Sequence, residues 1–434
     1  MTTDPQTPIT QNLPVQPAQP VQTVQQILTQ QMPIQQAPVE QAPAQQEYIE
    51  PETVSVESSE FDELNKLTSE ISTCGMPQGL KDRALDMVKR LNKLIQYGSF
   101  SREFEPVEKY VSWLIKIPWG KYTVDNIDLN NVKRQMDATH FGMLDVKEKM
   151  LEYVSMMNLL KKKELAGIQQ AGGAALDGSI SNEMLRLQGS SSHAPIICFV
   201  GVQGIGKTSV AKSIGAALGK QFVRISLGGL ASVTELRGIA RGNFDAGPGQ
   251  IIKSLIRTNS MNPLILMDEI DKVSDNGGSR ADVMAALLEI LDPEQNSTFV
   301  DHYLDYPIDL SKVMFVCTAN NLGGISAALL DRLEIVRMSS YTDEEKMHIA
   351  KDYLLPKVIG STGLDPEQLQ FDDDVWELVI RPLGFDAGIR QLERTLTTLA
   401  RKIAKMIVSG MGTHYRITKE NFREFIPMDF GVYS

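Results

Sequence analysis

The sequence predicts an α/β fold in which helices cover both faces of a parallel sheet. Five short apolar runs alternate with helical patterns between residues 196 and 338, and strands separated by helices pair in parallel. The first run leads directly into a glycine-rich loop and then into a helical pattern. Beyond residue 341 only helical patterns remain, so we expect a second, smaller all-α domain, with a further helical region before the sheet.

The expected strands are short and consist largely of β-branched and aliphatic side chains. They are residues 196–200, 222–226, 264–267, 313–318 and 335–338. Helical spacing of apolar residues before the sheet predicts helices on both sides of Pro77, one that ends near Pro118 and one over 146–160. After the sheet, Thr342 is the expected N-cap of a helix. Two more helices are expected near 372–380 and 387–408.

The composition divides the chain into parts. Residues 1–60 are rich in Gln and Pro and cannot bury enough apolar surface to offset their ordering entropy, so we expect a disordered tail. This tail is either an inert linker or a tether that binds a partner. Residues 164–193 are rich in Gly, Ala and Ser, which indicates a flexible insertion. The expected parts are the tail 1–60, a helical region 61–130, the α/β domain 131–340, a helical domain 341–425 and a C-terminal tail 426–434.

The overall composition excludes several classes of protein. The 434 residues are 42% hydrophobic, which is typical of a globular protein, and no apolar run reaches the roughly 18 residues of a membrane span. The net charge is −11, but residues 1–65 hold nine acids and no Lys or Arg, which leaves −2 for the rest and no basic field for nucleic acid. Cys74, Cys198 and Cys317 form neither a disulfide framework nor a zinc motif. We therefore expect a cytoplasmic protein that binds neither membranes nor nucleic acids.

A phosphate-binding loop connects the first strand to the next helix. It fits the pattern G-x-x-x-x-G-K-[ST] at every fixed position and has the strand–loop–helix context that the motif needs. Glycines let backbone N–H groups approach phosphate oxygens, Lys207 can reach the terminal phosphates, and Thr208 can bind Mg²⁺. The alternative, a chance glycine-rich turn, fits this context poorly. The loop consists of Gly201, Val202, Gln203, Gly204, Ile205, Gly206, Lys207 and Thr208.

Two carboxylates end the apolar run over 264–267. Asp268 can hold Mg²⁺, directly or through water, and Glu269 can take a proton from an attacking water molecule. The structural alternative is a pair of solvated acids at a strand end. Downstream of a phosphate loop, such a pair instead favours catalysis. The sequence therefore predicts an enzyme that binds ATP and Mg²⁺ and hydrolyses the nucleotide.

The stretch from about residue 67 to 427 resembles the ATPase part of Lon, the ATP-dependent protease of the AAA+ superfamily. Long ungapped matches carry the resemblance, and they are residues 110–119, 137–142, 287–296, 301–304 and 388–394. The resemblance implies an AAA+ α/β domain with a small helical lid and a Lon-like helical arm over 61–130. It also implies ATP and Mg²⁺ as cofactors, and a homo-oligomeric, hexameric ring that acts on protein clients.

The resemblance assigns polar residues around the nucleotide. Asn320 matches sensor 1, which orients the attacking water, although an ordinary turn Asn is the alternative. Arg332 matches the arginine finger that reaches the nucleotide of the neighbouring subunit, with a surface salt bridge as its alternative. Arg390 matches sensor 2 and would contact phosphate from the lid of the same subunit, whereas Arg394, one turn on, is expected to be structural.

The base of the nucleotide also has an expected neighbour. His140, Phe141 and Gly142 resemble the segment that lies beside the adenine in the family. Phe141 is then expected to pack against the base, and a plain core aromatic is the alternative.

The chain departs from Lon in two places. Lon carries an aromatic–hydrophobic–glycine trio in its pore loop, where this chain has Asn243, Phe244 and Asp245. Either Phe244 still grips the substrate, or the ring does not thread polypeptide as Lon does. The peptidase domain of Lon, with its Ser–Lys dyad, would begin near Ser434, where this sequence ends. We therefore expect no intrinsic serine peptidase activity.

Three functions remain open from the sequence. The first, favoured because all the residues for hydrolysis are retained, is an ATP-driven ring that remodels or unfolds proteins. The second is a regulator that docks on, or mixes with, a complete Lon ring. The third is the ATPase subunit of a split Lon-type protease whose peptidase lies on another chain.

Overall fold

The structure, a computed structural model, describes residues 54–96, 104–170, 196–230, 232–273, 279–380 and 388–425. Residues 1–53 and 426–434 of the expected tails, and residues 171–193 of the expected insertion, lie outside these ranges. Two expectations are corrected within them: residues 54–60 begin helix α1, and residues 164–170 continue helix α5. Both segments lack proline, so a helix that is held by its packed residues can extend through them.

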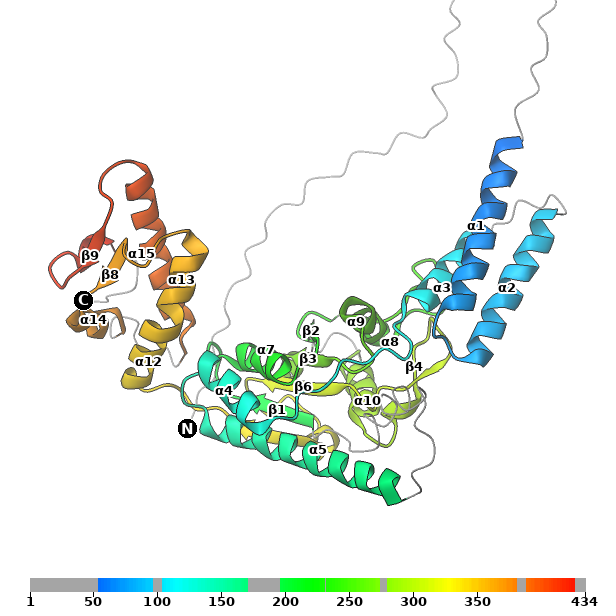
Figure 1. Cartoon of the computed structure of the whole chain (residues 1–434), viewed down its shortest axis with the longest axis horizontal. Helices are drawn as coiled ribbons and strands as arrows, with labels where there is room; N and C mark the ends of the chain where they lie inside the picture. Colours follow the sequence, from blue (N-terminus) through cyan, green and yellow to red (C-terminus); the bar gives the residue numbers. More distant parts are fainter. Residues whose placement is uncertain are drawn as a thin grey trace, which may run out of the picture. The chain divides into compact units, whose positions relative to one another are not determined.

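Three helices form the N-terminal part of the described chain, and Figure 1 shows the first two in blue. They are α1 (Val54–Thr73), α2 (Gln78–Gln96) and α3 (Phe104–Lys116). Pro77 separates α1 from α2 as predicted. The apolar sides of the helices, with Ile71, Val88 and Leu114 among their buried residues, share one hydrophobic core with the central sheet. The N-terminal helices are therefore packed against the α/β part of the chain.

The central sheet has five parallel strands in the order β2-β3-β6-β1-β7. They are β1 (Ile196–Val200), β2 (Phe222–Ser226), β3 (Leu264–Asp268), β6 (Met314–Ala319) and β7 (Leu333–Arg337). All five predicted strands are confirmed, with small shifts at their ends; β7 begins early because Leu333 pairs with Ile196, the first residue of β1. Since β6 lies between β3 and β1, the carboxyl ends of these three strands meet at one edge of the sheet.

Helices cover both faces of the sheet, which explains why its strands are apolar throughout. Ile197 and Phe199 face a core that they share with α4, α5 and α7, whereas Cys198 faces the core shared with α9, α10 and the N-terminal helices. These helices are α4 (Leu129–Thr139), α5 (Leu144–Gln170), α7 (Lys207–Ala217), α9 (Gln250–Thr258) and α10 (Ser279–Leu291). Shorter elements are α8 (Val233–Arg237), α11 (Ala327–Leu330) and the antiparallel pair β4 (Phe299–Val300) and β5 (Pro307–Ile308). Within the described ranges, no helix combines the length and apolarity that crossing a membrane requires.

The segment after the sheet has its own hydrophobic core. Its elements are α12 (Asp343–Ile349), a π-helical turn (Ala350–Leu354), α13 (Leu355–Thr362), β8 (Leu369–Phe371), α14 (Trp376–Ile380), α15 (Arg390–Val408), β9 (Tyr415–Ile417) and α16 (Phe422–Phe425). Thr342 caps α12 as predicted, since its Oγ1 accepts from Glu345 N at 3.2 Å while Glu345 Oε2 accepts from Thr342 N at 2.9 Å. This Thr–Glu pair is a capping box.

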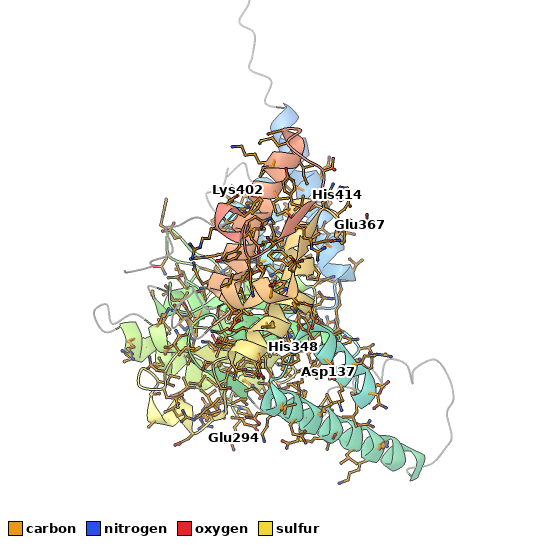
Figure 2. The ribbon with its side chains drawn as sticks, turned by 90° about the vertical axis from the view of Figure 1, so that its left-hand side faces the viewer. Asp137, Glu294, His348, Glu367, Lys402 and His414 are labelled. Atoms are coloured by element: carbon orange, nitrogen blue, oxygen red, sulfur yellow. The ribbon has the colours of Figure 1, made fainter. Side chains whose placement is uncertain are left out.

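The C-terminal segment is mainly helical, but the expectation of a purely helical domain is wrong in one detail. Strands β8 and β9 form a parallel pair, and Figure 2 labels Glu367 and His414 on the turns that lead into them. Each strand buries a single side chain fully, Leu369 in β8 and Ile417 in β9. One buried residue gives no alternating pattern, so a strand of this length leaves no signal in the sequence.

Candidate active site

The phosphate loop lies between β1 and α7. Gly204 and Gly206 have φ values of 85° and 92°, in the left-handed region where a side chain would be strained. At Gly201 a Cβ atom would lie 2.5 Å from the carbonyl oxygen of Met338, so this position also requires glycine. Gly206 is the N-cap of α7 and provides no side-chain cap, which leaves the first N–H groups of the helix available to an anion.

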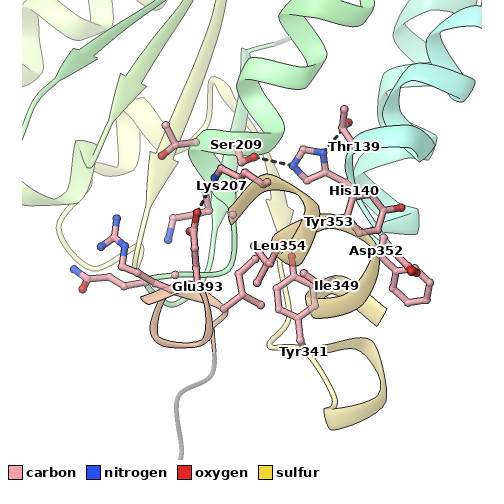
Figure 3. Close-up of a pocket in the computed structure, with 18 of the residues that line it drawn as sticks. Thr139, His140, Lys207, Ser209, Tyr341, Ile349, Asp352, Tyr353, Leu354 and Glu393 are labelled. Atoms are coloured by element: carbon pink, nitrogen blue, oxygen red, sulfur yellow. Dashed lines mark hydrogen bonds and ion pairs between the residues drawn. The ribbon is translucent and has the colours of Figure 1, made fainter. Parts of the chain in front are cut away.

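A pocket of about 610 Å³ adjoins this loop. Figure 3 shows Lys207, Ser209 and His140 on one side of it and Tyr341, Ile349 and Leu354 on the other. The predicted residues that line the pocket are His140, Phe141, Gln203, Gly204, Gly206, Lys207, Thr208, Asp268, Glu269, Asn320 and Arg390. The predicted residues outside its lining are Gly142, Gly201, Val202, Ile205, Arg332 and Phe244.

Lys207 joins the phosphate loop to the end of β6. Its Nζ donates to the carbonyl oxygen of Val202 at 2.9 Å and to Asn320 Oδ1 at 2.9 Å. Burial lowers the pKa of Lys207, while the nearby carboxylates of Asp271, Asp268 and Glu269 act in the opposite direction. The predicted phosphate ligand and the predicted sensor asparagine are thus in direct contact, although 113 residues separate them in the sequence.

The two carboxylates at the end of β3 differ in their surroundings. Asp268 is 5% exposed, and its Oδ2 lies 2.6 Å from Nε of Arg224 on β2. Glu269 has a left-handed backbone with φ 60°, and its Oε1 accepts from Lys272 Nζ at 2.8 Å. A positive φ is uncommon outside glycine, and strained residues of this kind cluster at active sites and ligand-binding segments. Asp268 is therefore held in the sheet, while Glu269 is turned out of the strand direction and into the pocket lining.

Thr318 on β6 links both carboxylate residues. Its hydroxyl donates to Asp268 Oδ1 and accepts from the backbone N–H of Glu269 at 2.9 Å. The side chain is fully buried, so no water can replace either bond. Sequence reasoning missed Thr318 because it is an ordinary polar residue near the end of a strand. Arg224 was missed as well, although a charged side chain inside the apolar run over 222–226 is a usable signal.

Replacing Thr318 tests this link. In Thr318→Val the side chain keeps its shape but loses both hydrogen bonds, so we expect ATP turnover to fall by about 10- to 100-fold through misplaced carboxylates. The free energy of unfolding should fall by about 1–3 kcal/mol, because buried polar groups lose their hydrogen-bond partner. Steady-state hydrolysis and thermal melting measure the two effects. Thr318→Ser keeps the hydroxyl and serves as the control; turnover at the wild-type rate in the valine variant would contradict the assignment.

The segment beside the expected adenine site is partly built into the pocket. His140 Nε2 lies 3.1 Å from Ser209 Oγ, and burial, assisted by Lys147, lowers the pKa of His140 to about 4. Phe141 lines the pocket but also stacks on His348 of α12, with ring centroids 5.0 Å apart. Gly142 does not line the pocket. A neutral histidine and a stacked aromatic suit an uncharged heterocycle, and contact with the adenine stays a prediction.

The C-terminal segment reaches the phosphate loop through a backbone contact. The N–H of Ile389 donates to the carbonyl oxygen of Gly204 at 3.0 Å, and a Cβ on Gly388 would lie only 2.6 Å from the carbonyl carbon of Gly204. Arg390 follows at the first position of α15 and lines the pocket. A cation is unfavourable at a helix N-terminus unless an anion is near, so this position suits a phosphate ligand.

Arg332 and Phe244 lie outside the lining of the pocket. Arg332 Nη1 is 3.0 Å from Oδ2 of Asp292, which is 2% exposed, so the ion pair considered as an alternative for Arg332 is present within the chain. The Arg332 side chain is nevertheless 41% exposed, so part of it remains accessible to another molecule. Phe244 is fully exposed at the tip of a hairpin. Neither residue lines the pocket of its own chain.

Mg²⁺ would find two oxygen ligands in the pocket. The Thr208 hydroxyl and the Asp268 carboxylate both line it, and Mg²⁺ prefers few protein ligands supplemented by phosphate oxygens and water. In the part of the chain that the structure describes, no group of three or more His, Cys, Asp or Glu side chains could hold a metal without such help. The donor set therefore fits a nucleotide-bound Mg²⁺ rather than a resident metal centre.

Fold and pocket together define a class, the ATPases of the AAA+ kind with a helical lid. Residues 197–341 match the family model described as ATPase family associated with various cellular activities (AAA). Residues 360–415 match the model of the Lon protease AAA+ ATPase lid domain. The chain thus matches a general AAA ATPase model over one stretch and a Lon-specific lid model over the next.

Similar full-length proteins carry the same family name. The chain is 40% identical to a Lon protease of Endomicrobium trichonymphae over 343 residues, which are 79% of this chain and 38% of that protein. It is 41% identical to Lon protease 1 of Bacillus subtilis over 364 residues, 84% of this chain and 43% of that protein. The chain therefore spans about two fifths of the length of the curated relatives that it matches.

Proposed function

We propose that this chain is an ATP-hydrolysing motor that assembles into a ring and remodels or unfolds protein clients. One observation carries the proposal: a single pocket brings together Lys207, Thr208, Asp268, Glu269 and Asn320, which come from the ends of three neighbouring strands and the helix after them. This is the set of groups that binding and hydrolysis of a nucleoside triphosphate require.

Each group has a task when MgATP is bound, since the nucleotide supplies the phosphoryl group and Mg²⁺ neutralises its charge. Lys207 exchanges its contact with the Val202 carbonyl for phosphate oxygens, to which it binds more strongly. Thr208 and Asp268 supply oxygen ligands to the metal ion. Glu269 accepts a proton from the attacking water, and Asn320 orients that water by its amide.

Assembly into a hexameric ring is supported by the position of Arg332. Arg332 does not line the pocket of its own chain, and its side chain is 41% exposed, which supports a role at the nucleotide of a neighbouring copy. The family likeness supports the same arrangement. We further propose that the ring works in the cytoplasm, since three dispersed cysteines suit a reducing compartment.

The relation to proteolysis gives a second candidate function. The relatives are named Lon proteases, and the chain matches two fifths of their length, so the second candidate is an ATPase part that works together with a peptidase. We favour a motor without intrinsic peptidase activity, because the residues assigned here serve ATP hydrolysis alone. Incubating the purified chain with casein and MgATP tests the expectation, common to both candidates, that this chain alone does not cleave protein. The motor hypothesis expects ATP turnover to rise and casein to remain intact; cleavage of casein by the pure chain would contradict it.

The proposed grip on clients makes a prediction for Phe244. Because this side chain is fully exposed at a hairpin tip, its removal should weaken contact with an unfolded protein without disturbing the core. In Phe244→Ala we expect the ratio of casein-stimulated to basal ATP hydrolysis to fall to about one, whereas Phe244→Tyr, which keeps an aromatic ring, should retain most of it. An unchanged ratio in the alanine variant would remove Phe244 from the client-binding surface.

A further inference from the structure

The exposed Phe244 lies on a glycine-rich hairpin. Its two legs meet in one antiparallel bridge, where Ile239 N–H donates to the Gly247 carbonyl at 2.9 Å. Four glycines, at positions 238, 242, 247 and 249, lie within and beside it. Glycine loses more conformational freedom on ordering than any other residue. Beyond the bridge, two backbone hydrogen bonds order the tip, from Asn243 N–H to the Ala240 carbonyl at 3.1 Å and from Ala246 N–H to the Asn243 carbonyl at 3.2 Å. Contacts from outside the hairpin can restrict it further.

The base of the hairpin is anchored by a buried carboxylate. Asp301 is fully buried and accepts from the N–H groups of Gly249 at 2.7 Å, Tyr303 at 2.9 Å and Leu304 at 3.1 Å. Gly238 sits against the same carboxylate, where a Cβ would lie 2.7 Å from Oδ1. These contacts hold the two ends of the hairpin but do not reach its tip.

Two consecutive residues of α3 reach the two legs of the hairpin. Lys109 Nζ donates to the carbonyl oxygen of Ala246 at 3.1 Å. On the other leg, the Arg241 guanidinium lies 4.3 Å from the ring centroid of Tyr110. Tyr110 is itself fixed, because it is 1% exposed and its hydroxyl donates to the carbonyl oxygen of Leu304 at 2.9 Å. Both legs are therefore tied to one rigid helix.

A third contact joins the hairpin to α2. Asp305 Oδ2 accepts from Arg83 Nη2 at 3.1 Å and lies 3.7 Å from Arg241 Nη2. The backbone carbonyl of Asp305 accepts from Arg83 Nη1 at 3.2 Å. Asp305 has a left-handed backbone, with φ 50°, which turns this side chain toward both arginines. Arg241 thus lies between an aromatic face and a carboxylate, two partners that suit a guanidinium.

We propose that Lys109 and Arg241 are positioning residues that brace the Phe244 hairpin against helices α2 and α3. Each contact is weak when taken alone, since both cations are partly exposed. Together the two contacts restrict both legs of the hairpin, whose glycines would otherwise allow the tip to change position. A force that a bound client exerts on Phe244 is then transmitted to the N-terminal helices. These helices therefore take part in client binding. The functional half of this inference rests on the proposed function; the brace itself does not.

Hydrogen exchange tests the brace directly in the full chain. In the double variant Lys109→Met, Arg241→Gln, the amides of Ile239, Asn243, Ala246 and Gly247 should exchange about 10-fold faster, because the variant loses a charged hydrogen bond, a cation–π contact and the ion pair of Arg241 with Asp305. Lys116→Met, also exposed on α3 but without a contact to the hairpin, is the matched control and should leave these amides unchanged. Exchange at the wild-type rate in the double variant would overturn the proposal.

Client-stimulated ATP hydrolysis tests the consequence. In the double variant the casein concentration that gives half-maximal stimulation should rise about 10-fold, and Arg241→Lys, which keeps a cation over Tyr110, should recover part of the loss. A wild-type response in the double variant with faster-exchanging amides would overturn the role in gripping. If casein does not stimulate even the wild type, the proposed function fails, and the exchange experiment still decides the brace.

Discussion

The variant Glu269→Gln is expected to bind ATP as well as the wild type and to hydrolyse it about 10²- to 10⁴-fold more slowly. The amide keeps the size of the side chain and most of its contacts, but it cannot accept a proton from water. Asp268, Thr208 and Lys207, which we propose to hold the nucleotide and its metal ion, are untouched by the change. Fluorescent-nucleotide titration and phosphate release measure binding and turnover separately.

The matched control is Glu367→Gln, at an exposed position on the turn before β8 (Figure 2). It removes the same charge from the same chain without touching the pocket, so its turnover should equal that of the wild type. If Glu269→Gln hydrolyses ATP at a near wild-type rate, the general base is another group. Loss of ATP binding in this variant would instead show that Glu269 helps to hold the nucleotide.

Arg332→Ala should bind ATP and lose about 10³-fold or more in turnover, the range measured for arginines that stabilise a transferring phosphoryl group. Because Arg332 lies outside the pocket of its own chain, its effect should depend on assembly. Lys207→Ala has the opposite defect: it keeps Arg332 but binds nucleotide poorly. Mixing the two inactive variants should therefore restore part of the activity, since an intact pocket from one chain can meet an intact Arg332 from the other.

Arg401→Ala, at an exposed position on α15, is the control for loss of a guanidinium. Sedimentation of the wild type with MgATP should show oligomers wherever turnover is measured. A fully active monomer, or a mixture of variants no more active than its components, would rule out a contribution from the neighbouring chain. In that case the ion pair of Arg332 with Asp292 is the whole role of the side chain.

The parts of this protein that follow from local patterns were predictable, and the parts that depend on register were not. The phosphate loop, the carboxylate pair and the five strands each leave a signal within a few residues. Thr318 acquires its role only because β6 pairs with β3, which places its hydroxyl between Asp268 and Glu269. Likewise, Arg224 meets Asp268 because β2 pairs with β3, with Ser226 opposite Asp268.

Long-range contacts set a second limit. The contact between Lys109 and Ala246 joins residues 137 positions apart, and the sequence of neither segment predicts it. The same holds for Arg332, whose partner Asp292 lies in a different motif of the chain. Opposite charges on a surface have many possible partners, and only packing selects among them.

Because Glu269 has a left-handed backbone, thermal stability and ATP turnover favour different residues at this position. A non-glycine residue in this conformation costs roughly 1–2 kcal/mol, which glycine would not incur. Glycine at this position would remove that cost and, at the same time, the carboxylate that we propose as the general base. We expect that selection of variants by melting temperature alone would favour glycine or asparagine at this position. The selected proteins would be thermally stable but would not hydrolyse ATP.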